Sequence, residues 1–221
     1  MHRTRIKICG LTRAQDLQAA VVSGADAVGF VFYGPSPRHI APEAAGRLLA
    51  GLPPFVTSVG LFVNATAEEV EAVLAVAPVS LLQFHGDETV AQCVAIAQAV
   101  RRPFLRAVRV KSGMEPQDLL EYERAYRAAS PLFAGLLLDA FVDGYGGGGK
   151  VFDWSLIPEE LAPRVVLSGG LSEQNVTEAL VRVRPYAVDV SSGVEFGKGI
   201  KDAAKIRAFI SAVQAADASI K

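Results

Sequence analysis

Apolar residues occur along the chain in eight short runs rich in β-branched side chains, and longer segments with helical spacing separate these runs. The runs begin 22 to 31 residues apart, which is the length of one strand plus one helix. Within a run the apolar residues are consecutive rather than alternating, as is typical of parallel strands covered on both faces. The predicted strands are Arg5–Cys9, Ala27–Phe32, Thr57–Val63, Leu81–His85, Phe104–Val110, Gly135–Asp139, Arg164–Ser168 and Ala187–Ser191.

The segments between the runs carry helix signals. Thr12 with Gln15, and Thr66 with Glu69, have the spacing of a capping box. Apolar residues follow one helical face at Val70, Val73, Leu74 and Ala77, at Val176, Ala179, Leu180 and Val183, and at Ile206, Phe209, Ile210 and Val213. Eight such units without a linker predict one α/β domain over residues 1–221, a single (β/α)8 TIM barrel. The competing architecture is an open, doubly wound sheet.

Composition narrows the class of protein. The chain is 51% hydrophobic and 20% charged, and its net charge is −1, which argues against disorder and against a nucleic-acid partner. The mean hydropathy of +0.30 raises the question of a membrane, but no apolar run approaches the roughly 20 residues that a spanning helix needs. The two cysteines lack metal-ligand spacing, which fits a reducing compartment. We therefore expect a soluble, cytoplasmic protein that uses no membrane and no metal.

Polar residues follow several predicted strands, and in a barrel these strand ends meet at one rim where catalytic groups lie. Cys9 ends the first strand, and taken alone such a cysteine is more often a small buried side chain than a reactive group. Asp139 follows three leucines, and a carboxylate there is costly without a partner or a function. His85 ends the fourth strand; a hydrogen-bonding role is the simpler interpretation, and we keep it among the candidate substrate-binding residues.

Glycine-bearing turns follow the seventh and eighth predicted strands, which is where barrels commonly bind phosphate through backbone N–H groups. The alternative is that the glycines serve only the tight turns. The candidate phosphate-binding residues are Gly169, Gly170, Ser191, Ser192 and Gly193, with Ser168 opening the first turn.

The glycine-rich segment 143–150 matches two nucleotide-binding patterns only superficially. Val151 stands where a P-loop needs Ser or Thr, and the residues after it make a poor dinucleotide-binding helix. Four successive glycines instead suggest a mobile loop over the rim.

Several motifs, in order along nearly the whole chain, resemble the phosphoribosylanthranilate isomerase family of tryptophan biosynthesis. They are Lys7-Ile-Cys-Gly10, Gln83-Phe-His-Gly-Asp87, Leu137-Leu-Asp139, Tyr145 to Trp154, Leu167-Ser-Gly-Gly-Leu171 and Val188 to Glu195. The chain departs from the family pattern at Gly148, where Ser or Thr is common, and at Phe196-Gly-Lys-Gly-Ile200 after the last strand. Both departures bear on loops rather than on the reaction.

The resemblance implies a cofactor-independent Amadori rearrangement of a phosphosugar. It implies Cys9 as general base, Asp139 as general acid and Arg38 as the receptor of the anthranilate carboxylate. Such an acid must be protonated, which requires an aspartate pKa above about 3.9, and such a base must lose a proton from a thiol with a pKa near about 8.5, either through a lowered pKa or on substrate arrival. An indole-glycerol-phosphate synthase is disfavoured because no lysine stands at the expected strand ends. A barrel that binds without turnover is the non-enzyme alternative, and a monomer and a homodimer both stay open.

Overall fold

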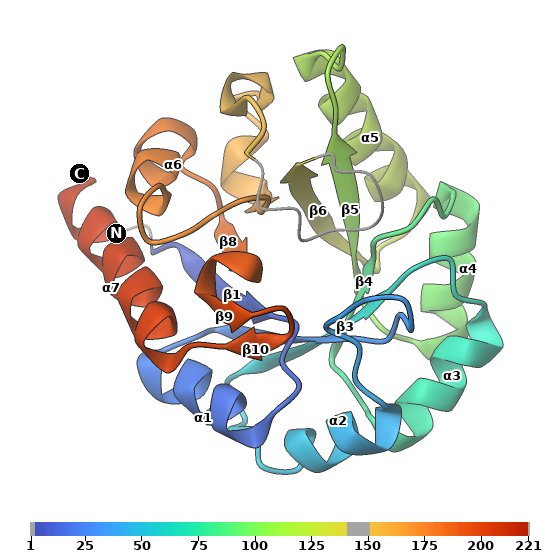
Figure 1. Ribbon diagram of the computed structural model, residues 1–221. Helices are drawn as coiled ribbons and strands as arrows, with labels where there is room; N and C mark the ends of the chain where they lie inside the picture. The colour runs from blue at the N-terminus through green and yellow to red at the C-terminus, as the bar shows by residue number, and fades with distance from the viewer. Residues whose placement is uncertain (1–2, 141–150, 221) are drawn as a thin grey trace.

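The computed structural model describes residues 3–140 and 151–220 and contains the predicted closed barrel of eight parallel strands (Figure 1). Neighbouring strands pair in chain order and β8 pairs with β1, which closes the ring and excludes the open sheet. The strands are β1 Arg5–Cys9, β2 Ala27–Val31, β3 Thr57–Phe62, β4 Leu81–Phe84, β5 Phe104–Val110, β6 Phe133–Ala140, β7 Val166–Leu167 and β8 Ala187–Val190.

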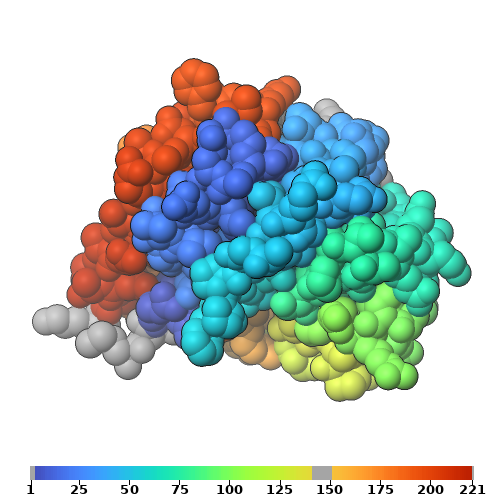
Figure 2. All heavy atoms as spheres, turned by 90° about the horizontal axis from the view of Figure 1, so that it is seen from below, coloured from blue at the N-terminus to red at the C-terminus, as the bar shows by residue number. Residues whose placement is uncertain are grey.

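Helices surround the barrel on its outside. In the described residues these are α1 Ala14–Ser23, α2 Pro42–Leu49, α3 Ala67–Val76, α4 Val90–Val100, α5 Pro116–Ala129, α6 Val176–Val183 and α7 Ala203–Ser219. Figure 2 views the side where α1, α2 and α3 lie, and these segments cover that surface in chain order. None of the described helices is long and apolar enough to cross a membrane.

The predicted element boundaries hold closely, with two differences. The seventh strand is shorter than predicted, because Arg164 belongs to a 3-10 turn, Ala162–Arg164, that precedes it. The capping box at Thr66 and Glu69 forms, but the one at Thr12 does not. Thr12 instead donates its hydroxyl to the carbonyl of Gly199 at 3.0 Å, so a tertiary partner replaces the local one.

The core has two parts. A large cluster fills the space between strands and helices, and a small one inside the barrel consists of Leu105, Ala107, Leu137, Val166 and Ala187. Alternate strand residues therefore point inward, and those nearest the carboxyl ends are the polar ones. This alternation is what aims the candidate site residues at a common rim.

Candidate active site

Cys9 and Asp139 both lie at the carboxyl ends of their strands, β1 and β6, and both are buried, with exposed fractions of 5% and 6%. In the ring β7 and β8 stand between these two strands. The structure therefore places a thiol and a carboxyl at the same end of one barrel, on strands 130 residues apart in sequence.

The thiol of Cys9 lies beside a buried ion pair. Lys7, two residues earlier on β1 and thus on the same face, donates from Nζ to Oδ1 of Asp189 on β8 at 2.7 Å. Burial would lower the pKa of Lys7, but Asp189 and Cys9 outweigh it and hold the pKa above its ordinary value. Lys7 is therefore a stable cation next to the thiol.

Burial raises the pKa of Cys9 above its ordinary value, and the nearby Lys7 ammonium only partly opposes it. The protein without substrate therefore holds a neutral thiol rather than a thiolate at neutral pH. Of the two expectations for this residue, a lowered pKa is wrong for the free protein, because desolvation exceeds the attraction of Lys7.

The carboxyl of Asp139 is held on both oxygens. Oδ1 accepts the Ala140 N–H at 2.9 Å, and Oδ2 lies 3.1 Å from Nε2 of His85. Nδ1 of His85 in turn lies 2.9 Å from the amide nitrogen of Gln83, which is fully buried. With Gln83 donating to Nδ1, the ring proton is on Nε2 and points at Asp139.

Gly169 permits another segment to approach Asp139. Its φ is +85°, and a Cβ at this position would lie 2.9 Å from Oδ1 of Asp139, closer than real Cβ atoms come. The predicted phosphate turn after β7 is thus adjacent to the candidate acid, and only glycine fits there.

Arg38 is buried rather than a surface arginine, with an exposed fraction of 8%. Its Nε and Nη2 donate to the two oxygens of Glu195 at 2.7 and 2.8 Å. Its stem lies against Gly10, where φ is +77° and a Cβ would come within 2.7 Å of Cδ, so Arg38 is close to the end of β1. Glu195 therefore occupies one edge of the guanidinium, and within residues 3–140 and 151–220 no partner occupies the edge formed by Nη1 and Nη2.

Glu195 and its second partner come from a hairpin after β8, formed by β9 Glu195–Gly197 and β10 Ile200–Lys201. Lys201 donates from Nζ to Glu195 and to both oxygens of Ser191, at 3.0 to 3.1 Å. Burial would raise the pKa of Glu195, but Arg38 and Lys201 outweigh it and hold the pKa below its usual range. The unusual sequence after the last strand is thus the scaffold that orients Arg38.

The two predicted phosphate turns touch each other, because Gly193 packs directly against the Leu171 carbonyl. Ser192 and Gly193 begin a 3-10 turn, Ser192–Val194. Among the described residues, none accepts a hydrogen bond from the N–H groups of Gly170, Ser192 or Gly193. Ser191 does something different, since its hydroxyl donates to the Cys9 carbonyl at 3.1 Å.

Sequence reasoning missed Lys7, Gln83 and Lys201 as site residues and did not assign Asp189 a partner. The signal was available in part, because Lys7 and Asp189 each interrupt an apolar strand. Two buried lysines, Lys7 and Lys201, thus lie close to the rim, although neither ends one of the eight barrel strands. The proposed loop 143–150 and the departure at Gly148 lie outside the described residues.

Comparison with known proteins gives a consistent result. The family model described as N-(5'-phosphoribosyl)anthranilate isomerase matches residues 6–212. The isomerase of that name from Herminiimonas arsenicoxydans is 70% identical over 221 residues, covering 100% of this chain and 97% of the relative.

Solved structures agree. The phosphoribosyl anthranilate isomerase of Thermotoga maritima superposes with a TM-score of 0.84 at 44% identity, covering 96% of this chain and 99% of that one. A second structure, described as monomers of the dimeric isomerase from that organism, has a TM-score of 0.80 at 39% identity, covering 96% and 98%. A third, in complex with reduced 1-(o-carboxyphenylamino)-1-deoxyribulose 5-phosphate, has a TM-score of 0.78 at 40% identity, covering 96% and 99%.

Proposed function

The chain belongs to the N-(5'-phosphoribosyl)anthranilate isomerase family, and from this premise we propose that Cys9 and Asp139 perform the proton transfers of its reaction. The enzyme converts N-(5'-phosphoribosyl)anthranilate into 1-(2-carboxyphenylamino)-1-deoxyribulose 5-phosphate, the third step from chorismate in L-tryptophan biosynthesis. The substrate is a small phosphosugar. Its rearrangement needs one group that gives a proton and one that takes a proton, and the two buried side chains supply them.

Asp139 is the general acid. It gives a proton to the furanose ring oxygen, the C1'–O bond breaks, and the ring opens to a Schiff base of the anthranilate nitrogen. His85 fixes the orientation of the carboxyl through its contact with Oδ2.

Cys9 is the general base. It removes the proton from C2' of the Schiff base, the electrons of that C–H bond form the enolamine, and tautomerisation gives the ketone. The thiol is neutral in the free protein, so it must lose its own proton before it can take the one at C2'. The cationic Schiff base bound beside it favours the thiolate, and the thiol proton passes to water. Lys7 supports this step, because its ammonium stabilises the developing thiolate.

Arg38 binds the anthranilate carboxylate through its free edge. Glu195 occupies Nε and one hydrogen of Nη2, and the Nη1–Nη2 edge still offers two parallel N–H groups. Because Glu195 and Lys201 hold the guanidinium in place, little side-chain entropy is lost when the substrate binds.

The phosphate lies between the turns after β7 and β8. The N–H groups of Gly170, Ser192 and Gly193 are donors without an acceptor among the described residues. They support an anion site built from uncharged backbone donors. Ser191 supports the site from below by joining it to β1.

The observation that carries these assignments is that Cys9, Asp139 and Arg38 lie at one end of the barrel. Each has a neighbouring polar group: the Lys7 ammonium beside Cys9, His85 on Asp139 and Glu195 on Arg38. The test is the loss of the fluorescence of the anthranilate substrate on addition of the wild-type enzyme. Because substrate and product are isomers of equal mass, turnover is shown by mass spectrometry after borohydride reduction of the product ketone, and such turnover supports the function. Tight substrate binding without turnover would favour a binding protein instead.

A homodimer is the proposed assembly, as in the dimeric Thermotoga relative. At the amino-terminal ends of the strands a hollow of about 560 Å³ opens, lined by Phe55, Tyr186, Leu105 and Val166 among others. Phe55 is 96% exposed there, and a two-fold contact through this face would cover it. We infer a single barrel domain over residues 1–221, and the buried thiols Cys9 and Cys93 suit the cytoplasm.

A further inference from the structure

His85 touches Asp139, and the backbone that carries His85 is held from outside the barrel by another buried ion pair, between Glu88 and Arg106. The side chain of Arg106 is 10% exposed and that of Glu88 2%. On β5 the neighbours Leu105 and Ala107 point into the barrel, so Arg106 points outward and does not face the substrate.

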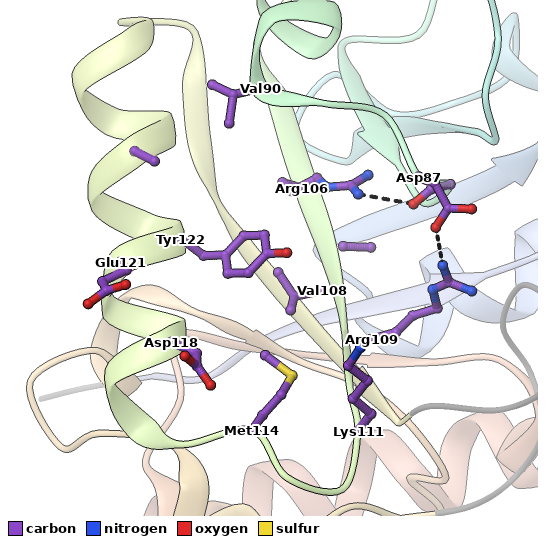
Figure 3. A pocket seen from close by; sticks show the side chains of 13 residues that line it. Asp87, Val90, Arg106, Val108, Arg109, Lys111, Met114, Asp118, Glu121 and Tyr122 are labelled. Atoms are coloured by element: carbon purple, nitrogen blue, oxygen red, sulfur yellow. Dashed lines mark hydrogen bonds and ion pairs between the residues drawn. The ribbon is translucent and has the colours of Figure 1, made fainter.

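The pair holds the peptide groups on both sides of His85. Arg106 donates from Nη1 to the Phe84 carbonyl at 3.3 Å and from Nη2 to the Gly86 carbonyl at 3.0 Å. Glu88 accepts the Gly86 N–H at 3.0 Å on Oε2, the oxygen that also receives Nη1 of Arg106 at 2.6 Å. Figure 3 shows Arg106 reaching from β5 to the segment at Asp87, beside a hollow of about 580 Å³ that α5 borders.

Glu88 also connects a second loop to this clamp, by which we mean the Glu88–Arg106 ion pair and the backbone groups that it binds. Its Oε1 accepts the N–H of Asn64, the second residue after β3, at 2.6 Å. In the ladder between β4 and β5, Phe84 is the Cα partner of Arg106. The next residue, His85, is therefore level with Ala107, whose small side chain leaves room inside the barrel for the imidazole ring to reach β6. The clamp therefore fixes the backbone position of His85, and the small side chain of Ala107 leaves the path from the imidazole ring to Asp139 unobstructed.

Stability alone does not account for this arrangement. A buried ion pair often contributes no more than a well-packed apolar pair, and Nε of Arg106 has no partner within the described residues, which adds a cost. Resting on the proposed role of Asp139, we infer that Glu88 and Arg106 are positioning residues that act through His85 to hold the general acid in its productive geometry.

The first test is kinetic. Glu88→Gln should lower kcat by about 10–100-fold, the usual effect of displacing a catalytic group by up to an ångström, while KM changes by less than about twofold. Arg106→Lys, which keeps the charge but cannot reach both carbonyls, should act in the same direction and serves if Glu88→Gln folds poorly. The matched control is Glu123→Gln on α5, another buried carboxylate paired with two arginines, Arg127 and Arg164. It should lower the melting temperature without changing kcat.

A double-mutant cycle separates positioning from general damage. In a His85→Ala background, Glu88→Gln should change kcat by less than about twofold, because the group through which it acts is gone. Glu123→Gln should have the same effect in both backgrounds. An equal loss from Glu88→Gln with and without His85, or an unchanged kcat in a folded Glu88→Gln and Arg106→Lys, would overturn the inference.

A readout that needs no turnover distinguishes this inference from the proposed function. The chain has three histidines, so the ring nitrogen NMR signals of His85 can be assigned by substitution. Glu88→Gln should shift the Nε2 signal of His85 in the substrate-free protein, and Glu123→Gln should not. If the wild type does not turn over the substrate, the function fails while this measurement still tests the clamp; an unmoved Nε2 signal would refute the clamp alone.

Discussion

The two ends of the barrel hold charged residues in very different ways. At the carboxyl ends of the strands, the side chains of Lys7, Asp189, Arg38 and Glu195 are at most 10% exposed and form tight pairs. At the amino-terminal ends, Arg127 and Arg164 are each 47% exposed, and only the carboxylate that they share, Glu123, is buried among the three. Charges in water cost little to keep, whereas buried charges are expensive unless paired. On the proposed roles, the carboxyl end retains costly groups because the chemistry needs them, and we expect the amino-terminal end to tolerate substitution without loss of turnover.

The largest effects should come from the acid and the base. Asp139→Asn cannot donate a proton to the ring oxygen, and Cys9→Ser replaces the thiol with a far less acidic hydroxyl. Each should lower kcat by roughly 10²–10⁴-fold with substrate binding retained. Steady-state kinetics and circular dichroism check this, with Cys93→Ser, the other buried cysteine, as the control that keeps kcat. Near-normal turnover in a folded Cys9→Ser would mean that another residue is the base.

Next in size is the loss of the Arg38 guanidinium, which we propose binds the substrate carboxylate. Arg38→Ala removes two charge-assisted hydrogen bonds and should raise KM by about 10–100-fold with a smaller change in kcat. Arg164→Ala, at the opposite end of the barrel, should leave KM unchanged. An unchanged KM in Arg38→Ala, measured on protein shown to be folded, would assign the carboxylate to another group.

The pH profile gives a smaller and more specific effect. The pKa of Cys9 lies above its ordinary value because of burial, and the active form is the thiolate. A raised pKa moves the thiolate fraction to higher pH, so the rate of alkylation of Cys9 in substrate-free Cys93→Ser protein, which follows the thiolate fraction alone, should keep rising beyond a pH of about 8.5, by up to about tenfold per pH unit. A plateau reached below that pH would contradict a neutral thiol in the free protein.

The smallest effect on catalysis is expected at the amino-terminal end. Phe55→Ser should shift the protein from dimer to monomer in analytical ultracentrifugation and leave kcat within about twofold, since surface changes rarely reach a distant site. Tyr122→Ser, an exposed aromatic residue on α5, is the control that keeps the dimer. A wild-type monomer would refute the assembly, and a large loss of kcat in Phe55→Ser would break the contrast between the two ends.

The fold was largely predictable because strand patterns in a parallel barrel are local and repetitive. Arg5–Cys9 and Phe104–Val110 agree with their predicted bounds, and the ring order follows from consecutive pairing. The failure at Thr12 has the opposite origin: its partner, Gly199, is 187 residues away, and nothing in the local sequence indicates a tertiary acceptor. Sequence patterns therefore predicted the elements that depend on nearby residues, and failed where a distant residue provides the hydrogen-bond partner.

The candidate site was predictable in its residue types but not in its pairing. Strand ends marked Cys9, His85 and Asp139, while the family motifs identified Arg38. The sequence did not indicate that Glu195 would occupy one edge of Arg38. Nor did it indicate that burial would outweigh the effect of Lys7 on the pKa of Cys9, because both depend on how completely water is removed. Desolvation is a property of the closed barrel, and so it could not be estimated before the fold was known.

The ion pair between Lys7 and Asp189 joins residues 182 positions apart, and this separation has a consequence during protein synthesis. At 5–20 residues per second, a ribosome makes the partner of Lys7 roughly 10 to 35 s after Lys7 itself. During that interval the nascent chain carries Cys9 beside an unpaired lysine on an incomplete sheet. We therefore expect catalytic competence to arise late, with the residues that close the ring, and a chain interrupted before β8 to be inactive.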